Sequence, residues 1–113
     1  MELEEKREGE VLILILKGEL MGGDETDAFQ DRIYQAIQEN TVDVVLDMGS
    51  IKWMNSAGLG KIMAGLTTLR GSGGELKLAN LTERVRRPIE ITKLDNVIQM
   101  YETVDAADRK SVV

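Results

Sequence analysis

The sequence predicts an α/β domain, in which helices pack against a sheet of largely parallel strands. Two apolar runs of strand length, residues 11–16 and 42–46, are rich in branched side chains, as is typical of strands that are buried on both faces. Between these runs, four apolar residues have the spacing of one helix face: Phe29, Ile33, Ala36 and Ile37. A strand, a helix and a second strand in this order indicate a right-handed crossover between parallel strands.

The first part of the chain predicts an edge strand and then a buried one. Residues 2–7 are mostly charged, and charges discourage an exposed edge from pairing with other chains. Residues 17–20 end the buried strand, and the glycines of residues 21–24 indicate an irregular turn. Asp24 or Thr26 can cap the following helix, which we expect to run to about Glu39.

A second helix follows Ser56, because five apolar residues there have helical spacing: Leu59, Ile62, Met63, Leu66 and Leu69. Gly60 and Gly65 lie inside this helix. Since glycine costs about 1 kcal/mol there relative to alanine, we expect it to permit close packing against the sheet. The glycine-rich residues 71–74 then predict a turn before a strand at 75–79.

The last part of the chain predicts two short helices and a strand. Thr82 can cap a third helix that bears Val85, Ile89 and Thr92. Pro88 falls inside this pattern, so we expect either a kink or a helix that starts later than Thr82. Residues 97–101 predict a last short strand, and residues 104–109 a terminal helix.

Length and composition limit the function. The 113 residues suffice for one domain over 1–113, with its core in roughly 9–109. A net charge of −6, with one Trp, two Tyr and one Phe, argues against nucleic acid as a partner. Without His or Cys, no Ser-His-Asp triad or Cys-His pair can form, so we expect no enzyme, metal site or cofactor. The lack of Cys and of a long apolar run favours a cytoplasmic protein that does not insert into membranes.

The most informative stretch is residues 51–60, where a strand gives way to a helix. Either Asn55 or Ser56 can be the N-cap of this helix. The free N–H groups and the dipole at a helix start favour a negative charge, so Ser56 is suited to carry a phosphate. A phosphate adds about −1.5 to −2 charges, which a docked partner would sense. The simpler interpretation is that Ser56 only caps the helix.

Two glycine-containing stretches could be mistaken for phosphate-binding loops. Residues 58–61 do not form a P-loop, because Asn55 and Ile62 stand where that motif requires Gly and then Ser or Thr. Residues 71–74 precede a strand rather than a helix, which favours a simple turn.

Two further features have a structural and a functional interpretation. Arg84, Arg86 and Arg87 form a basic run that we interpret as solvated surface, with docking of an acidic partner as the alternative. Trp53 lies next to the 51–60 stretch, and we expect it to anchor the core or its rim rather than to stack on a ligand.

Residues 55–60, Asn-Ser-Ala-Gly-Leu-Gly, resemble the D-S-x-G-L-G loop of bacterial anti-sigma factor antagonists, which are members of the STAS domain family. Other parts follow in family order: Gly18-Glu19-Leu20 after the apolar strand, Val44-Val45-Leu46-Asp47 before the loop, and Gly73-Gly74 before the next strand. The resemblance covers roughly residues 9–109. It implies a STAS-type single domain with a mixed four- to five-stranded sheet packed against about four helices.

The resemblance also implies a partner switch that is controlled by phosphorylation. In the family, the unphosphorylated antagonist binds an anti-sigma factor, which frees the sigma factor for transcription. That anti-sigma factor is a serine kinase of the histidine-kinase-like ATPase type, and its phosphorylation of the loop serine weakens the complex. A metal-dependent serine phosphatase reverses the step. Carried over by position, the phosphorylated residue is Ser56.

We expect the partner surface to combine two stretches at the carboxyl ends of adjacent parallel strands. The residues of this surface are Met21, Gly22, Gly23 and Asp24 from the first stretch, and Asn55, Ala57, Gly58 and Leu59 from the second. Asn55 replaces the usual Asp of the family and keeps its capping ability. Met21 stands where many members have an acidic residue, and Asp24 can take over that role.

Two other classes of function stay open. A STAS-like domain can sense a small ligand such as a nucleotide, or serve as a soluble subunit of a transport complex. A carboxylate-based hydrolase rests only on the number of Asp and Glu residues. Genes for a kinase and a phosphatase nearby would favour the switch, whereas genes for transporter subunits would favour the second class.

Overall fold

A five-stranded mixed sheet forms the centre of the computed structural model. The structure describes residues 2–22 and 27–111, and within 27–111 it describes the side chains of residues 28–107. The strands lie in the order β1 (Glu2–Glu8), β2 (Val11–Leu20), β3 (Asp43–Met54), β4 (Glu75–Ala79) and β5 (Gln99–Tyr101). β1 is antiparallel to β2, and all other neighbours are parallel. The predicted sheet is confirmed.

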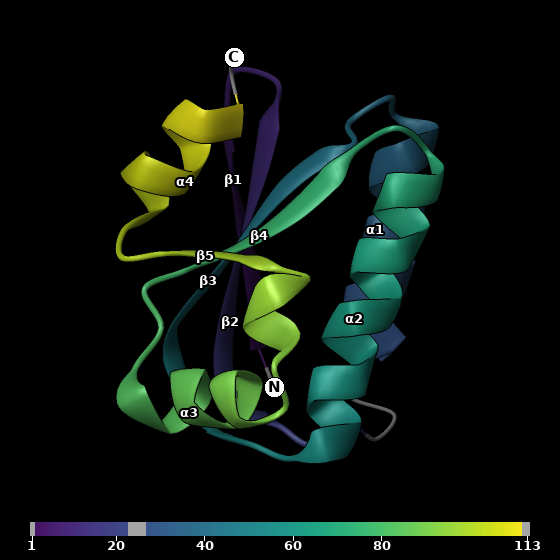
Figure 1. Cartoon of the computed structure of the whole chain (residues 1–113). Helices are drawn as coiled ribbons and strands as arrows, with labels where there is room; N and C mark the ends of the chain where they lie inside the picture. The colour runs from purple at the N-terminus through teal and green to yellow at the C-terminus, as the bar shows by residue number, and fades with distance from the viewer. Residues whose placement is uncertain (1, 23–26, 112–113) are drawn as a thin grey trace.

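Within the described residues, four α-helices pack on the sheet, as expected: α1 (Asp27–Gln38), α2 (Ser56–Gly71), α3 (Glu83–Ile91) and α4 (Val104–Ser111). A short 3-10 helix, η2 (Leu94–Asn96), precedes β5. The helices α1 and α2 lie side by side along one face, α3 lies at the end where β3 leads into α2, and α4 lies on the other face (Figure 1).

Both faces of the central strands are buried, which explains their continuous apolar runs. Leu12, Leu14 and Leu16 of β2 belong to the large core under α1, α2 and α3. Val11 and Ile13 of the same strand face the opposite way, in a smaller cluster that includes Ala107 of α4. The alternation along β2 therefore places helices on both sides of the sheet.

β3 is longer than the predicted strand at 42–46, because it continues to Met54. The pairing of β3 with β2 has two irregularities, and at each of them β3 has one extra residue. The first lies opposite the segment from Ile15 to Lys17 of β2, and the second lies opposite Gly18 and Glu19. Beyond Leu46, every third residue of β3 is buried: Met48, Ile51 and Met54. The residues between these buried positions, 49–50 and 52–53, are exposed.

Gly60 and Gly65, the two glycines of α2 for which close packing was expected, differ from each other. A Cβ atom at Gly65 would lie 3.0 Å from Cζ of Phe29, so this glycine lets α2 approach α1 rather than the sheet. At Gly60 a Cβ atom would meet nothing within 4 Å. The expected close packing against the sheet is therefore wrong for both positions, although Gly65 does permit a close contact.

The structure also differs from the predictions for the last part of the chain. α3 starts at Glu83, directly after the N-cap Thr82, and includes Pro88, so the expectation of a later start is wrong. Thr92, which we expected on this helix, is its C-cap, and its hydroxyl donates to the Pro88 carbonyl at 2.9 Å. β5 is shorter than residues 97–101 because η2 and the residues after it precede Gln99.

Ion pairs join the charged edge strand β1 to β2 and α1. Lys17 of β2 donates to Glu4 at 2.8 Å, and this hydrogen bond raises the pKa of Lys17 above its ordinary value. Arg32 of α1 contacts Glu5 at 2.7 Å. No helix within residues 2–22 and 27–111 is long and apolar enough to span a membrane.

Candidate functional site

Asn55, not Ser56, is the N-cap of α2. Its backbone is extended, with φ −104° and ψ 178°, and its side-chain oxygen Oδ1 accepts a hydrogen bond from the Gly58 N–H at 2.8 Å. Its carbonyl accepts the hydrogen bond of the Leu59 N–H at 3.0 Å. Ser56 is therefore the first residue inside the helix, and the interpretation that it serves as the cap is wrong.

The Ser56 side chain is exposed at the start of this helix. Among the residues described, none forms a hydrogen bond with its hydroxyl or with the backbone N–H groups of Ser56 and Ala57. The first turn of α2 contains no acidic residue. The position thus combines an accessible hydroxyl with free amides that favour an added negative charge.

The start of α2 is fastened to the end of β2. The Asn55 N–H donates to the Leu20 carbonyl at 3.2 Å, and a Cβ atom on Gly58 would overlap that same carbonyl. Gly22 has φ +78°, a region that favours glycine, and a Cβ atom there would lie 2.5 Å from Cβ of Ala57. The two expected stretches of the site are therefore in direct contact.

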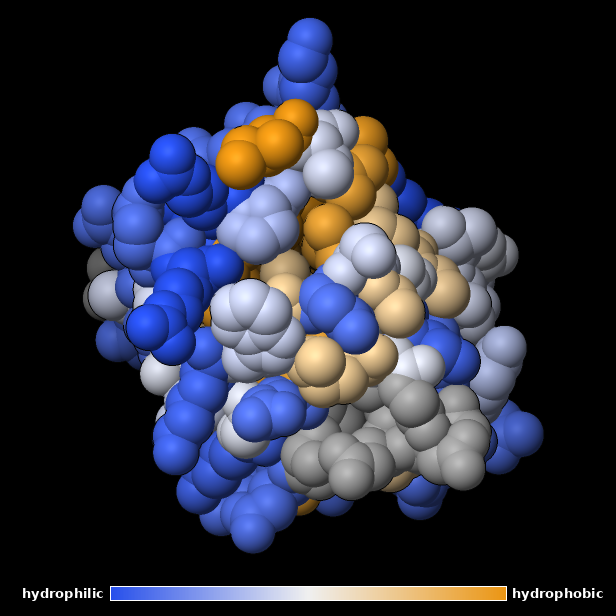
Figure 2. Space-filling model, turned by 90° about the horizontal axis from the view of Figure 1, so that it is seen from below, coloured by the Kyte–Doolittle hydropathy of each residue, from blue (hydrophilic) through white to orange (hydrophobic). Residues whose placement is uncertain are grey.

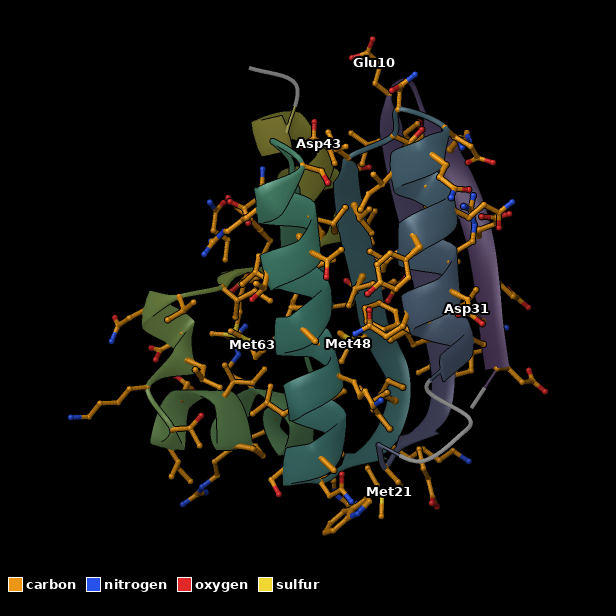
Figure 3. All side chains as sticks on the ribbon, turned by 90° about the vertical axis from the view of Figure 1, so that its right-hand side faces the viewer. Glu10, Met21, Asp31, Asp43, Met48 and Met63 are labelled. Atoms are coloured by element: carbon orange, nitrogen blue, oxygen red, sulfur yellow. The ribbon has the colours of Figure 1, made fainter. Side chains whose placement is uncertain are left out.

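The predicted partner residues differ in how much of them reaches the surface. Met21 is exposed by 40%, and it lies at the same end of the molecule as the start of α2 (Figure 3). Ala57 is exposed as well, whereas Gly58 is buried and Leu59 belongs to the core. Gly23 and Asp24 lie outside the described residues, so their contribution stays a prediction.

Trp53 is half exposed, at 51%, which excludes a place in the core and is compatible with the alternative that it lies at the rim. The second irregularity in the β2–β3 pairing leaves Lys52 and Trp53 both outside the core, because Ile51 and Met54 take the adjacent buried positions. Figure 2 views this end of the molecule and shows apolar and neutral side chains bordered by hydrophilic ones. A large aromatic surface thus lies three residues before Ser56.

A groove lies between the outer part of β3 and the start of α3. Its volume is about 620 Å³, and it is lined by Gly49, Ser50, Ile51, Lys52, Thr82, Glu83 and Arg84. Arg86 lines a different groove together with Arg70. The arginine run is therefore not one basic patch. In the part of the chain that the structure describes, no three acidic side chains are grouped as a metal site requires.

The comparison with known families identifies the class of protein. The STAS domain model matches residues 2–107, and the chain belongs to the STAS domain family. Its relatives include the anti-sigma F factor antagonist of Paenibacillus polymyxa, which is 27% identical over all of this chain and 97% of the relative. The anti-sigma-B factor antagonist of Bacillus subtilis is 33% identical, but the match spans 57% of this chain and 59% of that relative.

Solved structures have the same fold. An anti-sigma factor antagonist from Mycobacterium paratuberculosis has a TM-score of 0.84 at 22% identity, covering 99% of this chain and 94% of that one. Unphosphorylated SpoIIAA, also an anti-sigma factor antagonist, has a TM-score of 0.75 at 17% identity, covering 98% of this chain and 97% of that one. The expected membership in the STAS domain family is confirmed by the family model, and these structures share the fold.

Gly58 and Gly60 provide a matched test of how α2 is seated. Gly58→Ala should lower the free energy of unfolding by about 1–3 kcal/mol, because its new methyl group would overlap the Leu20 carbonyl. Gly60→Ala should raise it by about 0.5–1 kcal/mol, because that position is open and alanine favours a helix. Urea unfolding measures both changes. Equal effects of the two substitutions would contradict the observed contact.

Proposed function

We propose that this chain is an anti-sigma factor antagonist that acts as a phosphorylation-controlled partner switch. In this proposal, the unphosphorylated form binds an anti-sigma factor and so releases a sigma factor, and phosphorylation of Ser56 weakens the complex. The observation that carries the proposal is the exposed hydroxyl of Ser56 at the first position of a helix that Asn55 caps. The names of the relatives support the general role.

A phosphate on Ser56 is compatible with the fold. It would add about −1.5 to −2 charges beside the free amides at the start of α2, where a negative charge contributes roughly 0.3–1 kcal/mol of stability. The cap would persist, because Asn55 rather than Ser56 accepts the Gly58 N–H. With Asn55 in place of the family's Asp, the phosphate is also the first full negative charge in this turn.

The same phosphate would disturb a complex formed on this surface. Met21, Trp53 and Ala57 present apolar atoms around the start of α2. A phosphate buried against such atoms loses its hydration without gaining a counter-charge, which is unfavourable. Phosphorylation therefore acts on the interface while the domain stays folded.

The partners in this proposal follow from the resemblance of residues 55–60 to the loop of the family. They are an anti-sigma factor serine kinase of the histidine-kinase-like ATPase type, and a metal-dependent serine phosphatase. The kinase must reach the Ser56 hydroxyl, and the exposure of Ser56 permits this.

Phosphorylation of Ser56 can be tested directly. Incubation with the cognate kinase and ATP should add one phosphate to the wild-type chain and none to Ser56→Ala, as measured by intact mass and peptide mapping. Ser72→Ala is the matched control, since Ser72 is exposed at the other end of α2 and its loss should leave phosphorylation unchanged. Phosphate that persists in Ser56→Ala would refute the assignment.

Trp53 should anchor the partner complex. Buried tryptophans at interfaces often contribute 2 kcal/mol or more, so Trp53→Ala should weaken binding to the anti-sigma factor by about thirtyfold. Calorimetric titration measures this change, and circular dichroism checks the fold. Tyr34→Ala serves as the control, because Tyr34 is 55% exposed on α1, away from the start of α2. If both substitutions have the same effect on binding, Trp53 is not an anchor.

A further inference from the structure

The surface around Ser56 is too small to hold a partner by itself. Stable protein interfaces bury about 800 Å² on each side and involve about 20–30 residues. The exposed positions described at the start of α2 and the end of β2 are far fewer. A partner that covers Ser56 must therefore also contact neighbouring surface at this end of the sheet.

The groove between β3 and α3 is the neighbouring surface with a defined shape. It is lined by Lys52, which directly precedes the exposed Trp53 in β3, so the groove and Trp53 lie at the same end of that strand. α3 and the start of α2 both lie at this end of the sheet (Figure 1). One protein segment could thus contact Trp53 and enter the groove.

The groove carries two cations, and its one large apolar residue lies beneath it. The side chain of Ile51 is buried in the core beneath it. Lys52 and Arg84 line it and are exposed, and neither makes an ion pair or hydrogen bond with any described residue. Glu83 is its one acidic lining residue. The groove therefore carries an excess positive charge in a chain whose net charge is −6.

These features favour an acidic protein segment over a nucleotide. The two cations would attract carboxylates, and charge complementarity of this kind sets partner choice and association rate. None of the seven lining residues is aromatic, so the groove offers no ring on which a base could stack. Its glycine, Gly49, stands alone and forms no phosphate-binding loop.

We propose that this groove is the second half of the docking surface and binds an acidic segment of the anti-sigma factor partner. Carboxylates of that segment face Lys52 and Arg84. This inference rests on the proposed function for the identity of the partner. It gives a role to Arg84, which the loop around Ser56 does not involve.

Charge reversal tests the inference. Binding of the purified anti-sigma factor kinase is titrated at about 50 mM and about 200 mM salt against the wild-type chain and the double variant Lys52→Glu/Arg84→Glu. The double variant should bind at least tenfold more weakly at low salt and should lose most of the salt dependence. Lys52→Gln/Arg84→Gln should give a smaller loss in the same direction. Arg87→Glu, exposed on the same helix outside the groove, should bind within twofold of wild type.

Ser56→Asp is titrated in parallel so that the two proposals can fail separately. If Ser56→Asp weakens binding but the double variant binds within twofold of wild type, the groove inference is wrong and the switch stands. If the double variant weakens binding but Ser56→Asp does not, the groove stands and the switch is wrong. GTP and ATP are titrated at millimolar concentration with Trp53 fluorescence as the signal. Nucleotide binding that the double variant abolishes, with unchanged partner affinity, would also overturn the groove inference.

Discussion

The Leu20 carbonyl at the end of β2 fixes where α2 begins. It accepts the Asn55 N–H at 3.2 Å, and Gly58 packs against it at a distance that leaves no room for a side chain. Since β2 and β3 are neighbours in the sheet, this contact ties the first turn of α2 to the rigid centre of the domain. The position of Ser56 depends on it, because Ser56 lies between the two residues that make the contact.

In the proposed switch, this arrangement separates the residues that hold the helix start from the residue that is phosphorylated, within residues 55–58. Asn55 provides the cap and Gly58 provides the close approach, so neither task requires the hydroxyl of Ser56. A chemical change on Ser56 can therefore alter the surface that a partner meets without removing an interaction that holds the helix. Trp53 and Met21 are exposed, and in the proposed complex an added charge next to their apolar atoms would be unfavourable.

The sequence predicted the strands, the helices and the serine loop well, because buried runs and helical spacing reflect burial directly. It could not choose between Asn55 and Ser56 as the cap, since both side chains are good caps and the choice depends on backbone angles one residue apart. It could not decide between the core and the rim for Trp53, because bulges break the two-residue alternation of a strand. The sequence also suggested one basic patch for Arg84 and Arg86. Residues two positions apart on a helix point about 200° apart, and these two line different grooves.

The stability of the phosphorylated protein tests the central claim most directly. The chain phosphorylated at Ser56 and the unmodified chain are compared by urea unfolding, and the Gly58 amide is followed by NMR. We predict free energies of unfolding that agree within about 1 kcal/mol, with the Gly58 amide still hydrogen-bonded in the phosphorylated form. A loss of more than about 2 kcal/mol together with exchange of that amide would show that the phosphate acts by unfolding the helix start, and would contradict the claim.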